Sequence, residues 1–362
     1  MIVLIALAAV AALLTLAVAI LRLIPHTPLS EQFGSSRAVY ARNGELLRLT
    51  LAPDEQYRVW VPLDHISPTL VDAVLLYEDR SFYRHPGVNP VALIRSSWQM
   101  ASGGRRQGGS TLTMQLARRV YNIDSRSYSG KFAQIFAALW LQARYSKREV
   151  LEAYLNTAPY GGNIEGVQAA SLIYFQKNAV QLTLPEALTL AVIPQNPVKR
   201  IAERGLNTEL QAARQRLLAL WSERDPTARN LAPDAELVLS AQSRGNLPFR
   251  APHLTDMLLA QDRSTQDIRS TIDLRMQTTM ERVLQQYLRT RSDVGLINAS
   301  ALLLDASTME VRALIGSADW HNHQIEGQVN GTQGRRSPGS TLKPFIYALA
   351  LYQCLLHPKT IL

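Results

Sequence analysis

The stretch Ser67–Gly87, SPTLVDAVLLYEDRSFYRHPG, decides how the main domain of this 362-residue chain begins. Ser67 is a suitable N-cap and Pro68 suits the first helical position, so a helix is expected to start here. Apolar residues then follow at helical spacing, namely Leu70, Val71, Val74 and Leu75. The pattern predicts a partly buried helix that leads into Glu78 and leaves through the sharp turn at residues 85–87.

The end of this predicted helix carries an unusual group of charged and aromatic side chains. Glu78 and Asp79 are adjacent carboxylates, with Arg80 and His85 close by. Such a group is more often a solvated helix end, where the cations complement the helix dipole. Phe82 and the turn after His85 make the pattern more specific, because they fix how the chain leaves the helix. The segment is therefore a candidate site that other motifs must support.

A second polar block, GGSTLTMQ, occupies residues 108–115. Paired glycines before a Ser/Thr cap leave free backbone N–H groups at a helix start, which suits an anion. Arg105 and Arg106 lie just upstream and would suit a diphosphate. Thr111 and Gln115 are four residues apart and therefore share a helix face, and Arg118, three residues after Gln115, lies near it. The alternative is a flexible surface loop followed by an ordinary helix.

Two further blocks follow in the same predicted domain. Lys131 is followed at one helical turn by Gln134, and residues 146–156 read SKREVLEAYLN. The charged residues Glu149 and Glu152 would ordinarily form a solvated helix face. These blocks therefore gain functional weight only from their order relative to the first two.

Together the four blocks resemble the glycosyltransferase family 51 domain of class A penicillin-binding proteins over about residues 60–200. The family pattern Glu-Asp-x-x-Phe-x-x-His-x-Gly is met by Glu78, Asp79, Phe82, His85 and Gly87. Residues 108–115 meet the Gly-Gly-Ser-Thr-x-Thr-x-Gln block, and residues 154–156 meet Tyr-Leu-Asn. Residues 129–132 and Met114 are most similar to the 1C subfamily.

The resemblance implies a mostly α, lysozyme-like domain that acts on lipid II at the outer face of the cytoplasmic membrane. Glu78 would be the general base of glycosyl transfer. The implied substrate-binding residues are Asp79, Arg80, Phe82, His85, Ser110, Thr111, Gln115, Arg118, Lys131, Gln134 and Asn156. The metal ligands are unknown, and the resemblance allows a divalent cation such as Mg²⁺ at the diphosphate.

Two positions depart from the family pattern. Gln134 stands where the family usually has a second glutamate, and Arg118 stands where it has a lysine. A lipid diphosphate is already a good leaving group, and cations stabilise its charge. We therefore expect Glu78 to carry proton transfer without a second carboxylate.

A second domain is expected from about residue 271 onward. Its predicted elements are a helix at 274–289, strands at 299–305 and 310–315, and a helix from about Ser340. Residues 336–345, RSPGSTLKPF, resemble the Ser-x-x-Lys block of a penicillin-binding transpeptidase. The resemblance implies that Ser340 is the acyl-forming nucleophile and Lys343 its activator. Neither a Ser-x-Asn nor a Lys-Thr-Gly block follows, so we expect an incomplete α+β domain without efficient acylation of Ser340.

The first residues of the chain are apolar from Ile2 to Leu21, apart from Thr15. A helix of that length rises about 30 Å, which matches a bilayer core. No cleavage site with small residues precedes Pro25, so an uncleaved single-pass anchor is favoured over a signal peptide. Arg22 and Arg37 would weakly place the rest of the chain in the cytoplasm. The motifs instead indicate catalytic domains on the outer, periplasmic side of the bacterial inner membrane.

The expected organisation has five parts: an N-terminal transmembrane anchor at 1–24, a membrane-proximal connector at 25–60, the glycosyltransferase domain at 61–222, a linker at 223–270 and the incomplete transpeptidase domain at 271–362. Short strands are predicted around Asn43-Gly44 in the connector. Beyond the helix that ends at Glu78, helices are predicted at 91–100, 110–120, 131–145, 148–155 and 185–192.

Composition restricts the partners. A net charge of +9 indicates an anionic partner, and the single cysteine, Cys354, excludes an internal disulfide. No nucleic-acid-binding fold is visible, so the expected partners are lipid II, nascent peptidoglycan, the membrane and other cell wall synthesis proteins. Two alternatives remain open at this point: a lytic transglycosylase, which would have little use for the basic cluster, and a wall-binding scaffold without activity.

Overall fold

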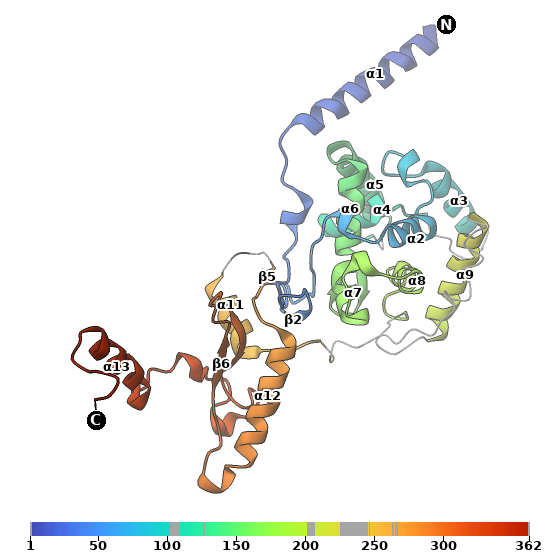
Figure 1. The fold of residues 1–362 in the computed structure, drawn as a ribbon. Helices are drawn as coiled ribbons and strands as arrows, with labels where there is room; N and C mark the ends of the chain where they lie inside the picture. Colours follow the sequence, from blue (N-terminus) through green and yellow to red (C-terminus); the bar gives the residue numbers. More distant parts are fainter. Residues whose placement is uncertain are drawn as a thin grey trace. The chain divides into compact units, whose positions relative to one another are not determined.

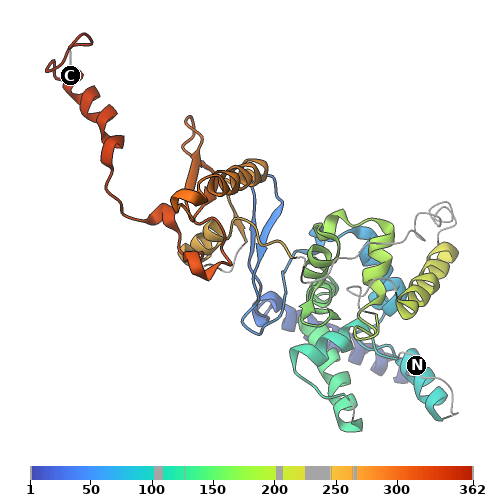
Figure 2. The same ribbon diagram turned by 90° about the horizontal axis from the view of Figure 1, so that it is seen from below.

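The structure is a computed structural model that describes residues 2–101, 109–125, 127–200, 207–224, 245, 247–262, 264 and 267–360. Its contacts divide the chain into two compact units. Unit 1 comprises residues 1–40, 44–250 and 263–269, and unit 2 comprises residues 41–43, 251–262 and 270–362. The elements of both units can be followed in Figure 1 and, from below, in Figure 2.

Unit 1 is mostly helical with two small sheets. Its α-helices are α1 (Ile2–Leu23), α2 (Pro68–Glu78), α3 (Pro90–Ala101), α4 (Leu112–Val120), α5 (Tyr128–Arg144), α6 (Lys147–Thr157), α7 (Val167–Phe175), α8 (Leu184–Val192) and α9 (Thr208–Arg224). Its strands are β1 (Ala38–Tyr40), β2 (Leu46–Leu49), β3 (Pro159–Gly161), β4 (Ile164–Glu165) and β5 (Ile268–Arg269). Its 3₁₀ turns are η1 (Leu29–Gln32), η2 (Leu63–His65), η3 (Phe82–Arg84) and η4 (Ala179–Gln181).

The predicted helices of unit 1 are confirmed, and their starts follow from local capping. The Thr111 hydroxyl accepts from the backbone N–H of Met114 at the start of α4. Ser146 and Glu149 form a reciprocal capping box at the start of α6. Glu149 is thus a capping residue and not only part of a solvated face.

Helices α7 and α9 were not predicted. The first eight residues of α7 are buried, so its sequence lacks the polar face by which an amphipathic helix is predicted. Helix α9 is mostly polar and buries only Leu210, Ala213, Arg214 and Leu217. Both elements complete a core in which α2 packs on α8 and α9, while α4 packs on α5 and α6. The largest fully buried side chains of this core include Tyr160, Tyr174 and Phe82.

Within unit 1, the segment predicted as a connector contributes two strands to a small sheet. Strands β1 and β2 pair antiparallel from Ala38↔Leu49 to Tyr40↔Leu46, around the predicted turn where Gly44 has a φ of 85°. Strand β5 pairs parallel to β1, although it lies in the segment predicted as a linker. A local turn could be read from the sequence, whereas the parallel partner comes from a distant part of the chain.

Unit 2 is a small α+β arrangement. Its elements are α11 (Pro252–Gln261), α12 (Leu274–Arg289), η8 (Ser292–Val294), β6 (Ala301–Leu304), β7 (Val311–Ile315), η9 (His323–Ile325), η10 (Gly331–Gln333), η11 (Gly339–Leu342) and α13 (Lys343–Tyr352). The predicted hairpin is confirmed as β6 and β7, and α12 packs along β7, as both views show. Helix α11 was missed because its segment was interpreted as part of the linker.

The N-terminal apolar run forms the 22-residue helix α1, which contacts α5. Within the part of the chain that the structure describes, no helix meets the combined length and apolarity of a membrane span. The predicted transmembrane helix is therefore not confirmed by the structure.

Candidate active site

Glu78 is the last residue of α2, a helix whose buried face consists of Leu70, Ala73, Val74 and Leu76. This packing places the Glu78 carboxylate where the chain turns away from the core. Glu78 Oε2 accepts a hydrogen bond from Gln115 Nε2 at 2.9 Å, while Oε1 is buried without a hydrogen-bond partner among the described residues. Gln115 comes from α4, so the structure brings the first two predicted blocks together.

The electrostatic surroundings of Glu78 suit a proton acceptor. Burial raises the pKa of Glu78 above its usual value, and the charge of Asp79 adds to this effect. The Gln115 hydrogen bond and the charge of Arg200 oppose it. A carboxylate with a raised pKa binds a proton more readily than an ordinary glutamate does, which is what a general base requires.

Asp79 and His85 are buried and hold the site together. The Asp79 carboxylate accepts from His85 Nε2 at 2.9 Å and from the backbone N–H of Leu112 at 3.1 Å. His85 Nδ1 accepts from the N–H of Gly87 at 3.2 Å, so its proton lies on Nε2. Asp79 therefore fixes the N-terminus of α4 against the end of α2, which positions Gln115 beside Glu78.

Gly87 and Thr111 complete this junction. Gly87 has a φ of +97°, and a Cβ there would lie 2.7 Å from the carbonyl oxygen of Ala138 on α5. The Thr111 hydroxyl donates to the carbonyl of Gly87 at 2.5 Å. The close approach of this turn to α5 requires glycine at position 87.

The third block forms a second polar group. Lys131 Nζ donates to Ser110 Oγ at 2.7 Å and to Gln134 Oε1 at 2.9 Å. Gln134 Nε2 donates to the carbonyl of Met114 at 2.7 Å. Burial lowers the pKa of Lys131, and the positive charge of Arg118 lowers it further. Both the oxygen and the nitrogen of the Gln134 amide thus form hydrogen bonds. An ionised glutamate has no N–H or O–H to donate, so it could not bind the carbonyl of Met114.

An open cleft of about 930 Å³ lies at the end of α2. Its walls carry Glu78, Asp79, Arg80, Arg84, His85, Arg95, Ser110 and Thr111. The guanidinium groups of this cleft can attract an anionic substrate and bring it to the Glu78 carboxylate.

Several predicted site residues are placed elsewhere. Asn156 is fully buried, where its side chain accepts from the N–H of Val61 at 2.9 Å and donates to the carbonyl of Val61 at 2.8 Å. Phe82 is also buried, with Lys147 Nζ 4.3 Å from its ring centroid. These side chains hold elements together and do not line the cleft. Arg105 and Arg106 lie outside the described residues.

Ser340 and Lys343 belong to unit 2 and are therefore a separate candidate pair. Ser340 lies in the turn η11, and Lys343 is the first residue of α13. Both side chains are exposed, and α13 buries none of its residues. The described part of the chain also contains no group of three or more His, Cys, Asp or Glu residues suited to a metal ion.

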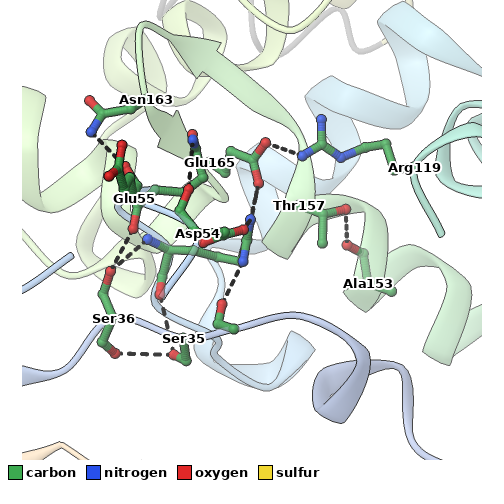
Figure 3. A network of polar contacts seen from close by, with 12 residues as sticks. Ser35, Ser36, Asp54, Glu55, Arg119, Ala153, Thr157, Asn163 and Glu165 are labelled. Carbon is green, nitrogen blue, oxygen red and sulfur yellow. Dashed lines mark hydrogen bonds and ion pairs between the residues drawn. The ribbon is translucent and has the colours of Figure 1, made fainter. Parts of the chain in front are cut away.

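A network of polar contacts that was not predicted joins α4 to the connector, and Figure 3 shows it. Glu165 on β4 forms ion pairs with both Arg119 and Arg58. Arg58 also donates to Asp54 at 2.8 Å. No periodicity marks these residues, because they come from a loop, a helix end and a two-residue strand. Their effect is to fix the C-terminal turn of α4, the helix that carries Gln115.

Comparison with known proteins finds one matching family model and several similar relatives. The family model described as Transglycosylase matches residues 43–221. Penicillin-binding protein 1C of Escherichia coli (strain K12) is 36% identical over 331 residues, which cover 90% of this chain and 42% of that protein. Penicillin-binding protein 2D of Bacillus subtilis (strain 168) is 31% identical over 340 residues, which cover 89% and 48%. The chain thus spans less than half the length of these two relatives.

A crystal structure of penicillin-binding protein 1A from Haemophilus influenzae aligns with a TM-score of 0.34 and 16% identity, covering 88% of this chain and 53% of that one. This likeness is too weak to support a fold assignment. The sequence matches, together with the ordered motifs around Glu78, confirm the predicted resemblance to class A penicillin-binding proteins, and residues 43–221 match the transglycosylase family model.

Proposed function

We propose that this chain is a peptidoglycan glycosyltransferase that polymerises lipid II into glycan strands, with Glu78 as the general base. The observation that carries the proposal is the placement of Glu78 at a cleft wall that also carries Arg80, Arg84 and Arg95. Gln115 orients the Oε2 atom of Glu78, and burial raises the pKa of the Glu78 carboxyl. A base and a basic surface in one cleft suit a sugar acceptor and a diphosphate donor.

In the proposed step, Glu78 takes the proton from an acceptor sugar hydroxyl. The oxygen of that hydroxyl forms a bond to the donor anomeric carbon, while the bond from that carbon to the lipid diphosphate breaks. The electron pair leaves with the diphosphate, whose negative charge requires cations. Lys131 and Arg118 are the cations of the second and third blocks, and Ser110 and Gln134 orient the Lys131 ammonium. No second carboxylic acid is needed to protonate such a leaving group.

We further propose a single-pass inner-membrane anchor at the N-terminus, with the catalytic domain on the outer side. The apolar sequence of residues 2–21 supports the anchor. Exposed apolar residues on α3 and α5 support contact of the domain with lipid: Val91, Ile94, Trp98, Tyr128, Phe132, Phe136 and Trp140. A lysozyme-like arrangement of unit 1, and partners among other cell wall synthesis proteins, belong to the same proposal.

The deciding experiment follows the lengthening of glycan chains from purified lipid II in detergent, with and without Mg²⁺. The full chain is expected to make polymer, and Glu78→Gln is expected to lower the rate at least a hundredfold, the usual contribution of general base catalysis being about 10²–10⁴. Glu209→Gln, an exposed change on α9, is the matched control and is expected to keep full activity.

The same assay separates the alternatives. Shortening of finished glycan, without lengthening of lipid II, would identify a lytic transglycosylase. If the wild type and Glu78→Gln both leave lipid II and finished glycan unchanged, the chain is a binding scaffold and the proposed function is wrong.

A further inference from the structure

Arg200, which follows α8, is a buried cation whose hydrogen-bond partners among the described residues are all neutral. It is 6% exposed. Its Nη1 lies 2.7 Å from the carbonyl oxygen of Val192, 3.0 Å from Gln195 Oε1 and 3.2 Å from the Tyr77 hydroxyl. Its Nε is buried without a hydrogen-bond partner in the described part of the chain. Burial of a charge among neutral acceptors is costly, so a role beyond packing is expected for this side chain.

Part of this arrangement is a helix cap. Val192 is the last residue of α8, and carbonyl groups in the last turn of a helix lack partners within the helix. A cation is also favoured there by the helix dipole. The cap explains the contact of Arg200 with Val192, but it does not require the contact with Tyr77.

The contact with Tyr77 connects Arg200 to the candidate active site. Tyr77 directly precedes Glu78 in the last turn of α2, and both residues line the cleft. The Tyr77 hydroxyl accepts from Arg200 and donates to Gln195 Oε1 at 3.0 Å. Successive side chains of a helix do not face each other, so Tyr77 reaches the segment after α8 while Glu78 reaches Gln115 on α4. The last turn of α2 is therefore held from two sides.

We propose that Arg200 is a positioning residue of the glycosyl transfer, which fixes the last turn of α2 through the Tyr77 hydroxyl and so sets the direction of the Glu78 carboxylate. This inference rests on the proposed function. The polar contacts of Glu78 and Asp79 tie this turn to α4, and Arg200 adds the tie to the end of α8, on which α2 packs (Figure 1). Helix ends fray, and a general base must stay within hydrogen-bond reach of the proton that it takes.

The choice of variants separates the geometry of Arg200 from its charge. Burial raises the pKa of Glu78, and the positive charge of Arg200 opposes this rise. Arg200→Lys keeps that charge but replaces the planar guanidinium with a compact ammonium, which cannot reproduce its hydrogen bonds. Tyr77→Phe keeps the aromatic ring and removes only the hydroxyl. Neither variant removes a charge from the site.

The test measures kcat and KM for lipid II with the full chain in detergent. A small misplacement of a catalytic group lowers the rate of the chemical step, so kcat should fall about tenfold in Tyr77→Phe and in Arg200→Lys. KM should stay within about twofold of the wild type, because Arg200 does not touch the substrate. A rise in KM with an unchanged kcat would show that the Tyr77 hydroxyl binds the substrate instead, and it would overturn the inference.

The double variant tests whether Arg200 acts through Tyr77. Once the Tyr77 hydroxyl is absent, the change at Arg200 has little left to disturb. We therefore expect the kcat of the double variant to lie within about twofold of that of the slower single variant. If the two losses multiply, Arg200 and Tyr77 act separately and the inference is wrong.

Tyr145→Phe is the matched control. The Tyr145 hydroxyl likewise donates one hydrogen bond and accepts another, to the carbonyl of Thr27 at 2.9 Å and from Gln32 Nε2 at 3.2 Å. Tyr145 follows α5 and does not line the cleft. The variant should lose similar stability and keep the kcat of the wild type. An equal loss of kcat in Tyr145→Phe and Tyr77→Phe would indicate a general effect of stability and would contradict the role of Arg200.

Hydrogen exchange separates this inference from the proposed function, because it needs no substrate. The backbone N–H of Asp79 donates to the carbonyl of Leu75 at 3.0 Å, so exchange in residues 75–79 reports the order of the last turn of α2. We expect this exchange to become about tenfold faster in Tyr77→Phe and Arg200→Lys, and to stay unchanged in Tyr145→Phe. If the chain is inactive on lipid II but the exchange rises, the proposed function fails and the positioning role stands. Unchanged exchange in both variants, or faster exchange in an active chain with an unchanged kcat, would overturn the inference.

Discussion

At the scale of single residues, Gln134 shows how one substitution in a family pattern changes the local chemistry. Its amide joins Lys131 to the carbonyl of Met114. Gln134→Glu would place a carboxylate oxygen against that carbonyl, and we expect the free energy of unfolding at pH 7 to fall by about 1–3 kcal/mol. Denaturant unfolding measures the change.

The loss should shrink as the pH falls, because a protonated glutamic acid can again donate to the carbonyl of Met114. Gln211→Glu, at an exposed position of α9, is the matched control and should change stability little at either pH. Equal stability of Gln134→Glu and the wild type at pH 7 would contradict the assigned role of the amide.

At the scale of elements, the turn at Gly87 sets the distance between the end of α2 and α5. Gly87→Ala would place a Cβ 2.7 Å from the Ala138 carbonyl and would also strain a backbone with a φ of +97°. We expect a loss of more than about 2 kcal/mol in the free energy of unfolding. Gly44→Ala is the control, because its φ is +85° but nothing lies within 4 Å of a Cβ there.

The two glycine variants separate strain of the backbone from displacement of an element. Gly44→Ala should cost only about 1 kcal/mol and should leave activity intact. Gly87→Ala should also lower glycan polymerisation, since the Gly87 carbonyl accepts from Thr111 at the start of α4. Similar unfolding midpoints for both variants would show that the contact with α5 can relax.

At the scale of the whole molecule, the two units are expected to differ in catalytic activity. Ser340 and Lys343 are exposed, and the backbone N–H of Lys343 donates to the carbonyl of Ser340. Among the described residues, no hydrogen bond joins the Ser340 hydroxyl to the Lys343 ammonium. An acyl-forming serine requires a base within hydrogen-bond reach and oriented donors for the oxyanion. We therefore expect at most trace labelling of the full chain by a fluorescent penicillin. Strong labelling that is lost in Ser340→Ala would prove this expectation wrong.

Much of the local structure followed from the sequence. The Ser/Thr cap at the start of α4 and the helix that ends at Glu78 depend on residues within a few positions of each other. The capping box at Ser146 is equally local but was not predicted. Helices α7 and α9 did not follow from it, since the former lacks a polar face and the latter has a narrow apolar one. The strand β5 and the ion pairs of Glu165 required partners from distant segments.

The sequence by itself determined which chemical groups are present and in what order, because capping, helical period and motif spacing are local properties of the chain. Only the tertiary structure decided which of those groups meet. It separated Gln115, which contacts Glu78, from Asn156, which holds Val61 in the core. It also buried the Glu78 carboxyl and so raised its pKa, because the pKa of a buried group depends on neighbours that packing selects.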